Sequence, residues 1–134
     1  MKKRLVALLL VVSLLLSLSA CGNSKPENLT QETYNLGKQA LEVMDNYLAG
    51  KMDEKTAEEE LSEIYDQLEA VGEALQEKAD GGDVDALSYA FSNGNICFTV
   101  SSFVLGMLGA ENAYGNMYDC QEMRDNLASD LEVE

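Results

Sequence analysis

Three cysteines, Cys21, Cys97 and Cys120, carry the most reactive side chains of this 134-residue chain. The chain contains no histidine, so no imidazole base can activate a thiol or a hydroxyl, and no imidazole can bind a metal. A thiol without such a base can still take up an acyl group, form a disulfide or be buried as a small apolar side chain. The segment around each cysteine decides which chemistry to expect.

Cys21 follows an apolar segment with a positively charged start. Lys2, Lys3 and Arg4 precede an uncharged, largely apolar run over residues 5–16, and small residues follow. This layout is typical of an export signal, and the run is shorter than the ~20 apolar residues of a permanent span. The stretch Leu18-Ser19-Ala20-Cys21 resembles the lipobox of bacterial lipoproteins.

The resemblance implies that a diacylglyceryl group, with acyl chains such as palmitate, is attached to the sulfur of Cys21. It also implies that the signal peptide, residues 1–20, is cleaved between Ala20 and Cys21. Two acyl chains hold a domain on a bilayer, at ~0.8 kcal/mol per buried methylene. We therefore expect a lipid-anchored protein on the extracytoplasmic face of the cell membrane. An ordinary signal peptide, or an anchor helix with a chance cysteine, is the alternative.

The segment after Cys21 is polar and contains the only proline of the chain, Pro26. It predicts a short tether, so that residues 21–29 comprise the lipidated cysteine and the tether and residues 30–131 form the folded domain. Removal of residues 1–20 takes away three of nine cations and none of 24 acids, which leaves 114 residues with a net charge of −18. Such a charge argues against nucleic acid as a partner, because nucleic-acid binding needs clustered lysine and arginine.

Two amphipathic helices are predicted at the start of the domain. The first runs from the N-cap Thr30 to a stop at Gly50, and the second runs over residues 54–79 with Asp53 as its cap. The short connection predicts an antiparallel hairpin. Their apolar stripes consist of Tyr34, Ala40, Leu41, Met44, Tyr47 and Leu48, and of Ala57, Leu61, Ile64, Tyr65, Leu68, Val71 and Leu75.

Acids dominate the outer face of the second helix and the turn after it. We interpret the outer face as solvated, with a cation-binding or partner-binding strip as the alternative. Asp80, Asp83 and Asp85 surround a Gly-Gly turn, but they lack the ligand spacing and the closing glutamate of a calcium loop. Capping and turn formation explain these acids better, so no metal and no cofactor is expected.

No charged residue occurs between Asp85 and Glu111. The favoured interpretation is a central helix, the most buried of the fold, that is hydrophobic nearly all round. Asn93-Gly94 could instead form the turn of a β-hairpin within residues 87–104, and the apolar half of the segment could span a membrane. A last, weaker helix is predicted from Met117 to Leu131, with Arg124 on its inward stripe, paired with an acid of another helix.

These features together resemble small helical lipoproteins of Gram-positive gut bacteria, most of which have no assigned function. The resemblance rests on Tyr47-Leu48-Ala49-Gly50-Lys51-Met52, the acid-rich helix, the acidic turn, the apolar helix and Arg124-Asp125-Asn126-Leu127. It implies an all-α fold, here a four-helix up-down bundle preceded by the signal peptide and the tether. It implies no catalytic or binding residue.

Cys97 and Cys120 could form a disulfide between the last two helices, since an exported location permits one. The alternative is that Cys97, inside an apolar run, is a free and buried thiol. Carboxylates are abundant enough for acid–base chemistry, but a bundle of this size has little room for a cleft, and no catalytic signature occurs. We expect no catalytic residue and no enzyme.

Two functions remain from the sequence. The favoured one is a non-enzymatic interaction module of the cell envelope that binds an unknown envelope protein. The other is a lipoprotein that binds a small ligand and assists a transporter. A pocket lined by Tyr89, Phe91 and Phe98 would favour ligand binding, whereas an exposed apolar patch would favour the interaction module.

Overall fold

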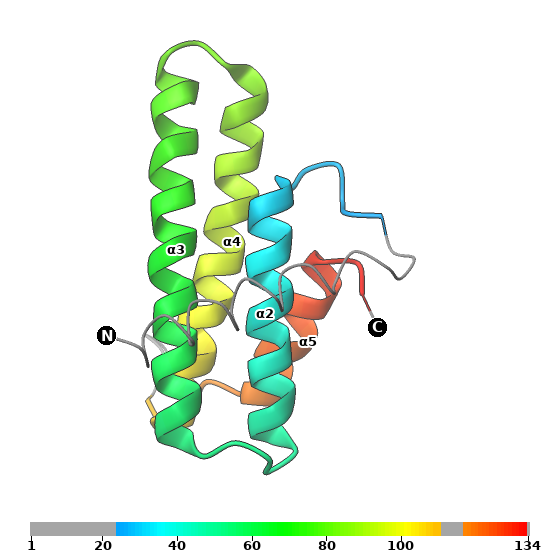
Figure 1. Ribbon diagram of the computed structural model, residues 1–134, viewed down its shortest axis with the longest axis vertical. Coiled ribbons are helices and arrows are strands. Elements are labelled where there is room, and N and C mark those ends of the chain that lie inside the picture. Colours follow the sequence, from blue (N-terminus) through cyan, green and yellow to red (C-terminus); the bar gives the residue numbers. More distant parts are fainter. Residues whose placement is uncertain (1–23, 111–116, 134) are drawn as a thin grey trace, which may run out of the picture.

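The computed structural model describes residues 24–110 and 117–133. This part of the chain forms four α-helices and no β-strand, so the prediction of an all-α fold is confirmed for it (Figure 1). The helices are α2 (Gln31–Leu48), α3 (Glu54–Asp80), α4 (Val84–Met107) and α5 (Cys120–Asp130). The predicted signal peptide and Cys21 lie outside the described residues.

Each helix begins at a side chain that accepts a hydrogen bond from the backbone N–H three residues later. Such caps satisfy N–H groups that have no partner within the helix. Thr30 and Asp53 cap their helices as the sequence predicts, and of the acids around the Gly-Gly turn it is Asp83 that caps the third helix. The last helix starts later than Met117, because Asp119 caps it and Cys120 is its first residue. The four caps are Thr30, Asp53, Asp83 and Asp119.

The uncharged segment after Asp85 is one continuous helix, α4. The β-hairpin alternative for residues 87–104 is therefore wrong, because Asn93 and Gly94 lie in the middle of this helix. None of the helices within residues 24–110 and 117–133 combines the length and the hydrophobicity of a transmembrane segment.

The two longest helices, α3 and α4, lie side by side and run in opposite directions (Figure 1). A short turn joins them, and α2 packs against the half of the pair that is remote from this turn. The short helix α5 contacts α4 and α2 but not α3, within the described residues. Both α4 and α2 therefore contact all three of the other helices.

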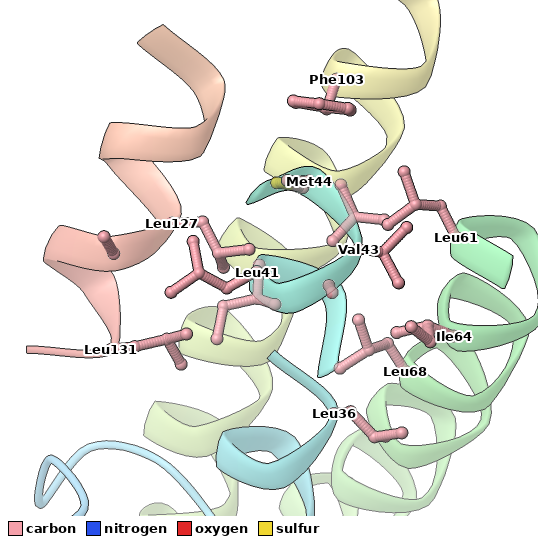
Figure 2. Packing of buried hydrophobic residues seen from close by; sticks show 14 of the residues in the cluster. Leu36, Leu41, Val43, Met44, Leu61, Ile64, Leu68, Phe103, Leu127 and Leu131 are labelled. Atoms are coloured by element: carbon pink, nitrogen blue, oxygen red, sulfur yellow. The ribbon is translucent and has the colours of Figure 1, made fainter. Parts of the chain in front are cut away.

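Figure 2 shows the core where leucines and other apolar side chains from all four helices meet. The predicted stripes of α2 and α3 supply much of this core, although Leu48 at the end of α2 is exposed. The core side chains with no measurable exposure are Ala40, Met44, Ala57, Leu61, Leu68, Ile96, Val100, Phe103, Leu127 and Leu131.

One buried side-chain amide connects three helices. Thr33 of α2 donates its hydroxyl to Asn93 Oδ1 at 2.9 Å, and Asn93 Nδ2 donates to the Leu68 carbonyl of α3 at 2.8 Å. Thr33 and Asn93 are both 1% exposed. Gly72 makes room for this amide, because a Cβ there would lie 2.9 Å from Asn93 Nδ2. The pairing matters because a buried polar group without a partner is costly.

Part of the segment expected to be a tether is packed on the helices. Pro26 is buried, and Leu29 belongs to the core at 1% exposure. Asn28 Nδ2 also donates to Ser92 Oγ of α4 at 3.1 Å. Pro26 and Leu29 of the predicted tether thus pack with the folded domain.

Replacement of Asn93 by leucine should lower the free energy of unfolding by about 1–3 kcal/mol, because the Thr33 hydroxyl and the Leu68 carbonyl would both lose their buried partner. Asn95→Leu, at an exposed position of the same helix, is the control and should change stability by less than about 0.5 kcal/mol. Urea-induced unfolding followed by circular dichroism measures both. Equal losses for the two variants would contradict the role of Asn93.

Candidate functional site

The side of α4 that faces away from the core is apolar and exposed. The sequence predicts that this helix is the most buried one, and the exposure of this side shows that the prediction is wrong. The neighbouring helices cover only the face that carries residues such as Ile96, Val100 and Phe103. The exposed apolar side chains are Val84 (79% exposed), Leu87 (41%), Phe91 (70%), Phe98 (63%), Leu105 (39%) and Leu108 (52%).

These side chains recur along α4 with a period of seven residues. Two small residues, Gly94 and Ser101, fill the remaining positions of the repeat. Alternate spacings of three and four residues place all eight positions on one stripe of a helix, as in the seam of a coiled coil. We call this stripe the α4 seam; it consists of Val84, Leu87, Phe91, Gly94, Phe98, Ser101, Leu105 and Leu108.

The α4 seam is large for an exposed apolar surface. From their exposed fractions, its six apolar side chains expose on the order of 500 Å² of surface. This area is near the upper end of the largest apolar patch on a typical monomeric protein. Residues 86–110 carry no charge, although the whole chain has a net charge of −15. Apolar patches of this size are typical of surfaces that bind another molecule.

Phe91 and Phe98 do not line a space between helices, because both point largely to solvent. Tyr89, the third residue considered for a ligand pocket, is partly exposed. The arrangement that would favour a small-ligand site is therefore not formed by these three side chains, whereas the exposed patch that would favour an interaction module is present.

Cys97 and Cys120 are free thiols, and the structure does not join them. Cys120 Sγ lies 3.7 Å from the carbonyl oxygen of Phe103, which is six residues, or about 9 Å, further along α4 than Cys97. A disulfide requires Cα atoms within ~7 Å of each other, so the disulfide alternative is wrong for this fold.

Neither thiol has the environment of an activated nucleophile. Burial raises the pKa of the Cys97 thiol, and the nearby carboxylate of Glu69 raises it further. Burial and the carboxylate of Asp119 likewise raise the pKa of Cys120. Reactive cysteines need the opposite, a positive environment that lowers the pKa, so both thiols stay protonated at neutral pH.

Arg124 of α5 pairs with Asp45 of α2. Its Nε donates to Asp45 Oδ1 at 2.7 Å, and its Nη2 donates to Oδ2 at 3.3 Å. The arginine side chain is 20% exposed, while that of Asp45 is 49% exposed. These hydrogen bonds raise the pKa of Arg124, which holds its charge in any case. The pair links two helices at the edge of the core, and the sequence did not single out Asp45.

The acids of the turn and of α3 serve as caps or face solvent. Asp83 accepts the backbone N–H of Ala86, and Asp80 and Asp85 are exposed. Within residues 24–110 and 117–133, no three His, Cys, Asp or Glu side chains are close enough together to hold a metal ion. The outer acids of α3 are exposed as well: Glu59, Glu63, Asp66, Glu73 and Glu77.

No protein-family model, curated protein or solved structure matches this chain. The strongest candidate for a functional site among the described residues is the α4 seam. The seven-residue repeat that forms the seam is visible in the sequence. It was missed because the same segment also carries the core residues, so that the whole segment reads as apolar.

Asp45→Asn removes the negative charge that pairs with Arg124. It should lower the free energy of unfolding by about 1 kcal/mol and not more, because solvent around the half-exposed carboxylate weakens the ion pair. Glu59→Gln is the control, because among the described residues Glu59 pairs only with Lys55, and both side chains are more than 60% exposed. The control should be neutral within about 0.5 kcal/mol. Thermal unfolding of the two variants tests this, and a neutral Asp45→Asn would show that the link between α2 and α5 contributes nothing.

Proposed function

We propose that this protein is a lipid-anchored lipoprotein of the extracytoplasmic face of the cell membrane and acts as a non-enzymatic interaction module of the cell envelope. In this proposal the signal peptide of residues 1–20 is removed, Cys21 carries the lipid, and a four-helix up-down bundle presents the α4 seam to an envelope protein. The single observation that supports the interaction role is the exposed, uncharged apolar face of α4.

An uncharged face on so acidic a domain favours a protein partner with an apolar surface. A cationic partner would find carboxylates on α3 but none on the seam. The acidic domain would also be repelled by anionic lipid headgroups, so that it would be held at the membrane by its anchor and not by the seam. The protonated thiols of Cys97 and Cys120 are consistent with a non-enzymatic role.

The anchor is tested by metabolic labelling with an alkyne analogue of a fatty acid. The wild-type chain should be labelled and Cys21→Ala should lose the label, because the sulfur of residue 21 is the attachment site. Cys97→Ala is the matched control, since it also removes one thiol and should keep the label. An unlabelled wild type, or a labelled Cys21→Ala, would overturn the proposed anchor.

The interaction role is tested by chemical crosslinking in cells, followed by mass spectrometry. Phe98→Asp places a charge at the centre of the seam and should reduce the yield of the specific partner at least tenfold, because the apolar contact would have to bury that charge. Ser62→Asp adds the same charge at an exposed position of α3 and should leave the yield unchanged. Equal yields for both variants would show that the seam is not the docking surface.

A further inference from the structure

The α4 seam has an internal symmetry that its function as a docking surface does not require. Position 96 is its midpoint, and seam residues at equal distances on either side of it are complementary in size. Nearest the midpoint, Gly94 matches Phe98, and further out Phe91 matches Ser101. Towards the ends, Leu87 is equivalent in position to Leu105, and Val84 to Leu108. Small residues therefore lie at positions equivalent to those of phenylalanines, and aliphatic residues at positions equivalent to those of other aliphatic residues.

We propose that the partner of the α4 seam is a second copy of this chain, and that the two α4 helices pair in antiparallel orientation about a twofold axis at residue 96. This inference rests on the proposed function of the seam as a docking surface. In such a pair each Phe98 packs over Gly94 of the other copy, and each Phe91 packs over Ser101. A twofold interface uses the same patch on both subunits, which is the property that the symmetry of the seam provides.

The space above Gly94 is suited to receive a phenylalanine ring. A Cβ added to Gly94 would meet no atom within 4 Å in the single chain, so the surface is open there. In a parallel pair, Phe91 and Phe98 would each face the same residue of the other copy, and Gly94 would face Gly94. The interface would then be overpacked at the phenylalanines and leave a void at the glycines. The antiparallel arrangement avoids both and gives every seam position a neighbour of suitable size.

Area and the lack of basic residues on α4 favour a second copy over a membrane. Two seams of on the order of 500 Å² each bury about 1,000 Å² together before flanking residues are counted, which reaches the lower range of specific protein interfaces. Helices that lie on membranes usually carry lysine or arginine on their polar face, and α4 carries none. The uncharged seam also lets two domains meet without placing carboxylates of α3 against each other at the centre of the contact.

The proposal is tested with the full-length chain in its membrane, with a photoreactive amino acid in place of Phe98. Illumination should give an adduct of twice the mass of the chain. A mixture of isotopically light and heavy chains should show that the adduct joins two copies, with the new bond near Gly94. The same residue in place of Phe91 should give a bond near Ser101.

Gly94→Leu is the decisive variant. It fills the space that the ring of the other copy needs, so the yield of the dimeric adduct should fall at least tenfold. The fold of the single chain should tolerate it, because Gly94 faces open space and leucine is a better helix former than glycine. Ser62→Leu adds the same side chain to the exposed face of α3 and should leave the yield unchanged; thermal unfolding checks that both variants are folded.

The other outcomes separate this inference from the proposed function. An adduct with a different envelope protein, and none with a second copy, would overturn self-pairing and support the interaction module. A bond between the two residues at position 98 would overturn the antiparallel register. An adduct with lipid, or no adduct, would overturn both proposals. A dimer that is strengthened by Gly94→Leu would also overturn the pairing, since an apolar side chain there would then add contact area instead of removing space.

Discussion

The fold depends on a buried amide at the centre of α4. Asn93 accepts from Thr33 of α2 and donates to the Leu68 carbonyl of α3, at 2.9 and 2.8 Å, and it is almost completely buried. Apolar contacts alone would let the helices slide past one another at small cost, whereas a buried amide is satisfied in one arrangement only. Gly72 allows the close approach that this arrangement needs. The rotation of α4 about its own axis follows from this contact, and with it the face of α4 that is left exposed.

The rotation of α4 joins the core to the candidate site. With Asn93 and Ile96 turned inward, Phe91, Gly94 and Phe98 must face outward, since these positions lie on the opposite side of a helix of 3.6 residues per turn. The protein thus exposes two phenylalanines on a domain whose other helices carry many exposed carboxylates. Exposure of this kind is unfavourable for a monomer unless another molecule covers it. This is the reason to regard the seam as functional and not as an accident of packing.

Prediction from the sequence was good where one physical rule decided the outcome. Helix starts followed from residues such as Thr30 and Asp53, and the inward stripes of α2 and α3 followed from their periodicity. It left alternatives open where two rules competed. Asn93-Gly94 has the chemistry of a tight turn, and it also suits a helix in which the amide is buried and the glycine faces outward. In the structure Thr33 and Leu68, 60 and 25 residues away, provide the hydrogen-bond partners that the amide has in the helix.

The sequence by itself determined the helical class of the described residues, the ends of most helices and the acidic, histidine-free chemistry of the chain, because these depend on composition and on neighbours within a few residues. The tertiary structure decided which side of α4 is buried, which acid pairs with Arg124, and that Cys97 and Cys120 lie too far apart for a bridge. These depend on the relative positions of helices far apart in the chain. Periodicity shows that a helix has an apolar face, but for a helix that is apolar on two faces only the packing of its neighbours selects the one that remains open.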